Sequence, residues 1–156
     1  MSMTETPTPR LGEMGLQNFA PYLMNRIMGR YNASLRDALS EFGLSTAKMR
    51  ALAVLAVNDG ILIRELAVFA VVEQSTLSRT LDKLLADGLI RRETDENDNR
   101  ATRVMITEEG RRVFEQIWPT MAASYEQMFQ GISTQERAAF VLTLQRILHN
   151  VRHHDI

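Results

Sequence analysis

Residues 73–106 contain, in unbroken order, a helix with a polar first turn, a glycine that ends it and two short segments of alternating polarity. Leucines recur at helical spacing from Leu77 to Leu85, and polar side chains occupy the other faces. Gly88 follows, and glycine takes a positive φ without steric cost, so the helix is predicted to end there. One face of this helix must pack, and the other is free to contact a partner.

Two candidate strands come after the glycine, over residues 89–94 and 101–106. In the second, Thr102, Val104 and Ile106 alternate with the residues between them. The polar residues 95–100 form a short connection, so a hairpin is predicted. Helix, glycine stop and hairpin in this order are typical of a winged helix-turn-helix, which predicts duplex DNA as a partner.

The chain on either side of this unit is predicted to be helical. Before it, apolar residues step by three or four over residues 16–42, where Gly43 ends the helix. Ser45 is suited to cap a second helix through Ala56, and residues 63–69 form a short third one.

Two further helices are predicted after the hairpin. Thr107 caps the first, and Pro119 within it predicts a kink. Ser133 with Glu136 forms a capping box that opens the last helix. The predicted fold class is therefore mainly α with a small β-wing, a winged helix-turn-helix flanked by N- and C-terminal dimerisation helices.

Length and composition indicate one domain. The 156 residues are 45% hydrophobic and 24% charged, as in an ordinary globular protein. Apolar stripes on the first helix and on the last two helices exceed what a small winged lobe can cover, which predicts a C2 homodimer. The predicted organisation is a flexible arm over 1–13 and one regulator domain over 14–156, with a DNA-binding lobe at 44–106 and dimerisation helices at 14–43 and 107–153.

Several classes of protein are excluded or disfavoured. The longest apolar stretches are far shorter than the ~18 residues of a membrane span, and the N-terminus lacks the pattern of a secretory signal. A cytoplasmic location is the expectation. The chain has no cysteine, so disulfides, thiolate metal sites and thiol redox sensing are excluded. The histidines are confined to the C-terminal end and no phosphate-binding glycine loop is present, so an enzyme is not predicted.

The formal net charge of −1 argues mildly against a nucleic-acid partner, because many such proteins are basic. The local pattern differs, since arginines and a lysine gather within residues 79–103 together with acidic residues. The order of the elements therefore carries the DNA interpretation more than the charge does.

Two segments resemble the MarR (multiple-antibiotic-resistance regulator) family. IRELAVFAVVEQSTLSRTLDKLLADGLIRRE resembles its helix-turn-helix, and DNRATRVMITEEG resembles its wing, an Asp-x-Arg signature leading into a Thr-Glu-x-Gly helix start. The resemblance implies a recognition helix in the major groove, a wing in the adjacent minor groove and terminal helices that pair two subunits. It covers residues 16–151 and implies DNA contacts at Gln74, Ser75, Thr76, Ser78, Arg79, Asp98 and Arg100.

Each candidate contact has an alternative structural role. Arg79 and Arg100 are the main candidates, although Arg79 is also suited to a solvated helix face and Arg100 to bracing the hairpin through Asp98. The secondary candidates for phosphate contacts are Lys83, Arg91, Arg92 and Arg103.

Two positions depart from the family pattern. Val71 stands where members often have glycine in the turn, and Glu73 stands where a Ser or Asp cap is common. A carboxylate beside a phosphate is repulsive, although it complements a helix N-terminus. The turn geometry is therefore the open question of this unit.

The resemblance also implies an effector cavity between the dimerisation helices and the DNA-binding lobe. Met, Tyr and Trp side chains at helical spacing are first of all core residues, and the candidate ligand contacts among them and beside them are Met28, Tyr31, Met49, Arg50 and Trp118. A small aromatic or amphipathic molecule is the expected effector, and for an aromatic carboxylate the candidate partner is Arg50 or another nearby cation. His149 and His153 share a helical face, but no third ligand is near, so neither a metal nor another cofactor is predicted.

The functional prediction is a sequence-specific regulator that binds a pseudo-palindromic operator in double-stranded DNA as a homodimer. A repressor relieved by a small-molecule ligand explains the helix order, the wing and the terminal helices together. The alternative is a winged-helix module that contacts proteins without specific DNA binding, which Val71, Glu73 and the slightly acidic total charge favour.

Overall fold

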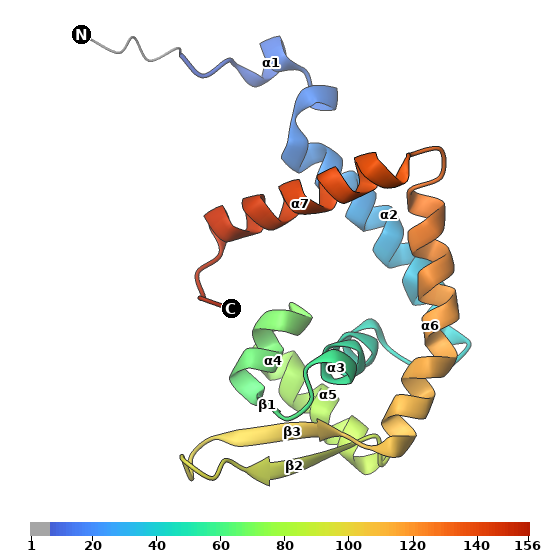
Figure 1. Cartoon of the computed structure of the whole chain (residues 1–156), viewed down its shortest axis with the longest axis vertical. Coiled ribbons are helices and arrows are strands. Elements are labelled where there is room, and N and C mark those ends of the chain that lie inside the picture. The colour runs from blue at the N-terminus through green and yellow to red at the C-terminus, as the bar shows by residue number, and fades with distance from the viewer. Residues whose placement is uncertain (1–6) are drawn as a thin grey trace, which may run out of the picture.

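The computed structural model describes residues 7–156, which form mostly helices and one small antiparallel sheet at the lower end of the molecule (Figure 1). This confirms the predicted fold class. The elements in chain order are α1 (Leu11–Met14), the 3-10 helix η1 (Leu16–Asn18), α2 (Ala20–Ser40), α3 (Thr46–Val57), β1 (Ile61–Leu62), α4 (Ile63–Ala70), α5 (Gln74–Ala86), β2 (Ile90–Thr94), β3 (Thr102–Ile106), α6 (Glu108–Met128) and α7 (Thr134–Val151).

The winged lobe, residues 44–106, packs α3, α4 and α5 against a sheet with strand order β1-β3-β2. The predicted hairpin is present, with Ile90 opposite Ile106 and Thr94 opposite Thr102. Gly88 has a φ of 74° and ends α5, as the sequence predicted. The core of the lobe consists of side chains that are almost fully buried, among them Leu52, Leu55, Leu66, Leu77, Leu81, Leu84, Ile90 and Val104.

Three local features differ from the sequence predictions. The strand β1 was not predicted, and it pairs with β3 through Ile61 opposite Val104. The long first helix begins only at Ala20, because η1 and the extended Phe19 precede it and Pro21 occupies its first turn. The short helix α1 was not predicted, and it overlaps the end of the arm expected over residues 1–13, whose residues 1–6 lie outside the described part of the chain.

The start of α6 is joined tightly to the winged lobe. The Thr107 side chain accepts a hydrogen bond from the Gly110 amide at 3.1 Å and donates to the Gly88 carbonyl at 2.7 Å. A Cβ on Gly110 would lie 2.2 Å from the Leu89 carbonyl oxygen, so only glycine allows this approach. These contacts fix the first turn of α6 to the winged lobe.

Farther along, α6 continues without interruption through Pro119. A second cluster of buried side chains, Leu35, Leu39, Met49 and Ile117, fastens α2 and α6 to α3. Figure 1 shows α6 running away from the winged lobe until the chain turns back into α7. The helices α2 and α6 thus connect the lobe to the outer part of the molecule.

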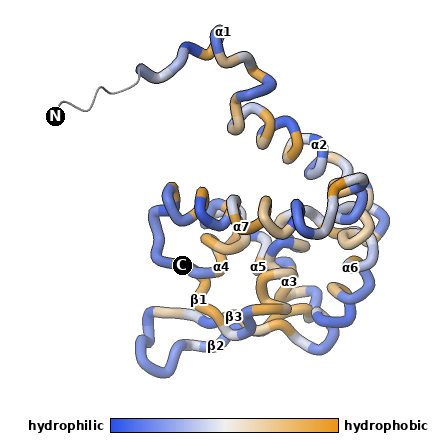
Figure 2. The backbone as a smooth tube through the Cα atoms, turned by 45° about the horizontal axis from the view of Figure 1, so that its top comes forward, coloured by the Kyte–Doolittle hydropathy of each residue, from blue (hydrophilic) through white to orange (hydrophobic). Residues whose placement is uncertain are grey.

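The turn into α7 is held by Arg137. Its guanidinium donates to both carboxylate oxygens of Glu126 at 2.9 and 3.1 Å and lies over the Phe129 ring at 4.7 Å. The ion pair lowers the pKa of the Glu126 carboxyl. Beyond this contact α7 has no buried residue, and Figure 2 shows apolar positions recurring along it and along α2.

Candidate nucleic-acid interface

The first turns of α5 present polar side chains to solvent. Gln74, Ser75, Ser78 and Arg79 are exposed, and Thr76 is half-buried. The opposite face of α5 lies in the core of the winged lobe, where Thr80 donates to the Thr76 carbonyl at 2.8 Å. One face of α5 therefore packs in the core and the other is exposed, as its sequence pattern predicted.

A cavity of about 450 Å³ lies between α5, the start of α4 and the wing. Gln74 and Ser78 line it from α5, and Asp98 and Arg100 line it from the wing. Arg64, in the first turn of α4, completes the wall. The structure thus brings together predicted residues from two separate segments and adds an arginine that the sequence analysis did not select.

The wing tip explains the Asp-x-Arg spacing. The Asp98 carboxylate accepts a hydrogen bond from the Arg100 backbone amide at 3.0 Å, which closes the turn. The Arg100 side chain does not take part in this bond. The buried Asp95 accepts from Arg103 at 2.5 Å, and Arg103 also donates to the Gly60 carbonyl at 2.8 Å. This bond from Arg103 holds the pKa of the Asp95 carboxyl below its usual value.

The cations of this unit fall into two groups. Arg91 pairs with Glu93, Arg92 with Asp82 at 2.8 Å, and Arg103 with Asp95. Within residues 7–156, no carboxylate lies within 4.0 Å of the charged groups of four others, Arg64, Arg79, Lys83 and Arg100. The unpaired group is the more available for a phosphate, because no internal ion pair must first be broken.

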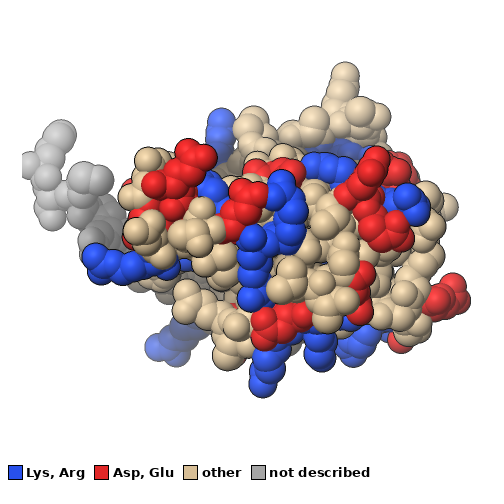
Figure 3. Space-filling view, turned by 90° about the horizontal axis from the view of Figure 1, so that it is seen from below, with Lys and Arg blue, Asp and Glu red and all other residues tan. Residues whose placement is uncertain are grey.

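Figure 3 shows the face that carries the wing, with Lys and Arg side chains running across it and Asp and Glu side chains beside them. The face is mixed in sign, in agreement with the net charge of −1. Affinity for a polyanion must therefore depend on particular cations rather than on a uniform positive surface.

The turn before α5 has an unusual backbone. Val71 adopts φ 53° and ψ 50°, the left-handed region that favours glycine, and its side chain is 78% exposed. Arg50 of α3 donates to the Val71 carbonyl at 3.5 Å. Glu73 is the N-cap of α5, but its side chain makes no capping hydrogen bond. Both departures from the family pattern therefore lie where the turn sets the direction of α5.

The five candidate ligand contacts lie in different surroundings. Met49 is buried in the cluster that joins α2, α3 and α6, whereas Met28 and Trp118 are exposed on their helices. Arg50 faces the turn at Val71. Tyr31 lines a cavity between α2 and α6.

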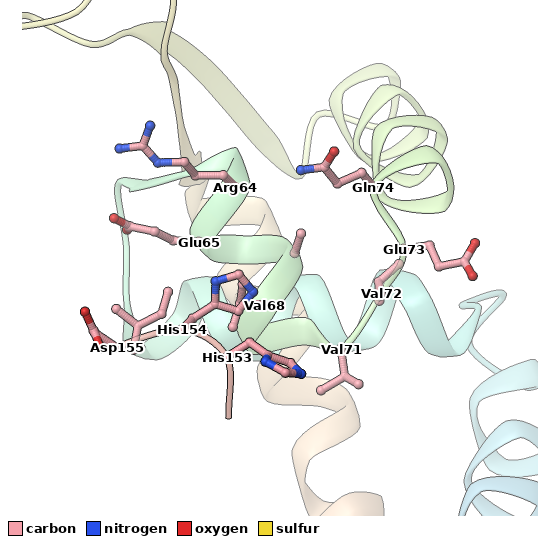
Figure 4. A pocket seen from close by; sticks show the side chains of 12 residues that line it. Arg64, Glu65, Val68, Val71, Val72, Glu73, Gln74, His153, His154 and Asp155 are labelled. Carbon is pink, nitrogen blue, oxygen red and sulfur yellow. The ribbon is translucent and has the colours of Figure 1, made fainter. Parts of the chain in front are cut away.

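The C-terminal residues lie opposite α4. His153, His154 and Asp155 line a cavity of about 890 Å³ together with Val68 and Val71 (Figure 4). Among the described residues, no three His, Asp or Glu side chains are grouped so that they could hold a metal ion. In that same part of the chain, no helix combines the length and apolar character needed to cross a membrane.

Comparison with known proteins identifies the family. The model of the MarR family matches residues 42–101. A crystal structure of a MarR-family transcriptional regulator from Silicibacter pomeroyi is 59% identical, with a TM-score of 0.90 over 95% of this chain and 100% of that one.

Two more distant relatives are regulators as well. The transcriptional repressor IacR of Pseudomonas putida is 25% identical over 92% of this chain and 86% of its own length. CouR from Rhodococcus jostii RHA1, solved bound to p-coumaroyl-CoA, is 25% identical, with a TM-score of 0.77 over 90% of this chain and 99% of that one. The protein described here therefore belongs to the MarR family, whose members are transcriptional regulators and not enzymes.

Proposed function

We propose that this protein is a repressor that binds a specific operator in duplex DNA as a homodimer and releases it when a small molecule binds. The observation that carries the proposal is the cavity lined jointly by α4, α5 and the wing. Gln74 and Ser78 on α5 supply hydrogen-bonding groups for base edges in a major groove. Arg64 and Arg100 flank them, and their guanidinium groups suit phosphates or the adjacent minor groove.

The proposed contacts have an order of importance. Arg64, Arg79, Lys83 and Arg100 come first, because each is unpaired among the described residues. Arg91, Arg92 and Arg103 come second, because each has a carboxylate partner in the chain. Ser75 and Thr76 extend the hydrogen-bonding surface along α5.

Repression and ligand control rest on the relatives. IacR is a repressor, and CouR was solved with an acyl-CoA ligand. Two recognition helices must sit at one fixed separation to enter two half-sites of an operator. A ligand that favours another separation releases the DNA, and it must bind the DNA-bound form more weakly by the same coupling, typically ~1–3 kcal/mol.

The homodimer follows from apolar faces that one chain leaves open. Phe140, Ile147, Leu148 and Val151 on α7 are all exposed, and none of its residues is buried. Leu16, Phe19, Leu23 and Ile27 are likewise exposed at the other end of the chain. A second copy that covers both faces accounts for them, and a C2 arrangement matches a pseudo-palindrome with half-sites ~10 bp apart.

Fluorescence anisotropy with DNA from the promoter of the protein's own gene tests the DNA contacts. We expect Arg64→Ala, Arg79→Ala and Arg100→Ala each to weaken binding by about 5- to 100-fold and to reduce the salt dependence. Arg146→Ala is the matched control, since it removes the same charge from α7. Parent-like affinity in all three variants, with circular dichroism unchanged, excludes this surface.

Sedimentation equilibrium tests the dimer. Ile147→Asp places a carboxylate in the proposed apolar interface and should weaken association by more than about 10-fold. Gln145→Asp, an exposed position two residues earlier on α7, should leave association unchanged. A parent protein that is monomeric at micromolar concentration contradicts the proposed assembly.

A further inference from the structure

The turn between α4 and α5 lacks the two local features that usually define such a turn. Glycine adopts a left-handed backbone without steric cost, but the residue at φ 53° and ψ 50° is Val71, whose branched side chain makes this conformation unfavourable. A Ser, Thr, Asp or Asn side chain would cap the first turn of α5, but the Glu73 side chain makes no capping hydrogen bond. A contact from outside the turn is therefore needed to hold it.

The chain on either side of this turn is anchored. Ala70 is buried, and Val72 packs against the core of the winged lobe. The Val71 amide donates to the Val68 carbonyl at 3.3 Å. The Val72 amide donates to the Ala67 carbonyl, also at 3.3 Å. Because α5 begins only three residues after Val71, the dihedral angles of this one residue set the direction in which the chain enters α5.

Arg50 of α3 supplies the contact from outside the turn. Its guanidinium donates to the Val71 carbonyl at 3.5 Å. The neighbouring Ala51 and Leu52 are fully buried, so the core of the lobe fixes the backbone from which this side chain extends. Within residues 7–156, no carboxylate lies within 4.0 Å of the Arg50 guanidinium. A cation is favourable at this place, because the carbonyls at the end of a helix carry a partial negative charge.

We propose that Arg50 is a positioning residue for DNA recognition, which holds the left-handed turn at Val71 and thereby fixes the direction of α5. It acts through the turn and not by touching DNA, since it does not line the cavity shared by α4, α5 and the wing. The cost of a left-handed valine and the gain from one hydrogen bond are of the same order, so loss of the bond shifts the turn toward other conformations. The effect on DNA binding rests on the proposed function, whereas the effect on the turn does not.

Nuclear Overhauser spectroscopy of the full chain without DNA tests the turn itself. A positive φ brings the amide proton of a residue close to its own Hα proton, so Val71 of the parent should give a strong intraresidue cross-peak. Arg50→Met keeps the stem of the side chain and removes its donors, and it should weaken this cross-peak and shift the amide signals of α5. Arg50→Lys retains a donor and should preserve both. An unchanged Val71 cross-peak in Arg50→Met overturns the proposal.

Fluorescence anisotropy with two duplexes tests the consequence for DNA binding. One duplex is the promoter DNA, and the other has the same length and base composition in scrambled order. Arg50→Met should lower the affinity for promoter DNA about 5-fold per recognition helix, and up to about 25-fold for a dimer, because only the fraction with the correct turn binds. Affinity for the scrambled duplex should change by less than about 2-fold, since the cations proposed to contact phosphates remain. An equal loss on both duplexes in a folded variant indicates a purely structural role and overturns the proposal.

Glycine at the turn gives the decisive comparison. Val71→Gly adopts the same backbone without steric cost, so adding Arg50→Met to it should change promoter affinity by less than about 2-fold. A loss as large as in the parent background means that Arg50 touches DNA or acts elsewhere, which overturns the assignment. Arg111→Met is the matched control, because Arg111 donates to the Ala56 carbonyl near the end of α3 at 3.4 Å and not to this turn. It should leave the ratio of the two affinities unchanged.

The positioning role and the proposed function fail in different ways. If the parent binds promoter and scrambled DNA equally, the proposed function is wrong, and the part of this inference that concerns DNA fails with it. The Val71 cross-peak then decides whether Arg50 holds the turn. If the parent prefers the promoter and Arg50→Met keeps that preference in full, the proposed function stands and the positioning role of Arg50 is removed.

Discussion

The winged lobe and α7 differ in how far their apolar side chains are buried. Within the lobe, leucines of α3, α4 and α5 are fully buried against each other and against the sheet. On α7, Leu148 and Val151 are 60% and 64% exposed, although the helix has the same kind of apolar repeat. One chain suffices for the first region, whereas the second leaves apolar surface that only another surface can cover.

The difference shows how the two tasks of a regulator are divided. Reading DNA requires side chains held at fixed positions, and a lobe with its own core and a wing locked by Arg92 and Arg103 provides that. In the proposed homodimer, changing the distance between the two winged lobes requires an interface that can rearrange. The outer helices, held to the rest mainly through Arg137 and the Leu35 cluster, are suited to it.

The largest expected change in stability comes from truncating a leucine to alanine, once in the winged lobe and once on α7. Leu81→Ala removes a fully buried side chain and should lower the free energy of unfolding by about 2–5 kcal/mol. Leu148→Ala should change it by less than about 0.5 kcal/mol at concentrations too low for dimers, and by more once dimers form. Urea unfolding over a range of protein concentrations measures both. A large, concentration-independent loss for Leu148→Ala breaks the comparison.

The next largest change in stability is expected at the start of α6, where this helix is joined to the winged lobe. Gly110→Ala forces a methyl group against the Leu89 carbonyl and the Ile106 side chain, and should cost about 1–3 kcal/mol of stability. Gly29→Ala in α2 meets no atom within 4 Å in the single chain and should stabilise the helix by about 0.5–1 kcal/mol. Thermal unfolding compares them. A destabilising Gly29→Ala sharpens the comparison, because it places that side of α2 against a second copy.

Much of the fold could be predicted from the sequence because its signals are periodic. Leucines at helical spacing, Gly88 and the alternating hairpin define α5 and the wing within a few residues. The strand β1 could not be found this way, since two residues show no period and their partner β3 lies about forty positions away. The break before Ala20 was missed for a related reason, because the apolar spacing continues through it while the backbone does not.

A smaller change is expected at the turn before α5, where a substitution should raise the stability of the protein. Val71→Gly relieves a left-handed conformation that costs an ordinary residue about 1–2 kcal/mol, and it adds about 0.5–1 kcal/mol of chain entropy to the unfolded state. The free energy of unfolding should therefore rise by up to about 1.5 kcal/mol. Val72→Gly is the matched control and should destabilise, because Val72 packs against the core of the lobe. If Val71→Gly also destabilises, contacts of the valine side chain outweigh the strain of its backbone.

The candidate site was predicted in part. Gln74, Ser78, Asp98 and Arg100 come from two segments and were selected through the resemblance to the family's recognition helix and wing. The structure places all four at one cavity, and their contact with DNA stays a prediction. Arg64 was missed because nothing in its own helix marks it, and only the packing of α4 beside α5 brings it to the cavity. The ion pairs of Arg92 and Arg103 could not be predicted from the sequence either, because each joins residues of different elements.

The smallest expected effect lies in the wing and depends on pH. Because Arg103 lowers the pKa of Asp95 from its usual value near 3.8, this carboxylate stabilises the folded state while it is ionised. The contribution is complete above the unfolded pKa of about 3.9 and is lost as the pH falls through the lower folded value. The Asp95→Asn variant lacks this stabilising contribution at every pH.

The stability difference between parent and Asp95→Asn should therefore be constant above about pH 5 and narrow steadily as the pH falls below the unfolded pKa of about 3.9. Urea midpoints measured at several pH values give this difference directly. Since the ion pair lies within one winged lobe, the difference should not depend on protein concentration, in contrast to the loss in Leu148→Ala. A gap that widens in acid, or one that changes with concentration, means that Asp95 is stabilised by something other than Arg103 of its own chain.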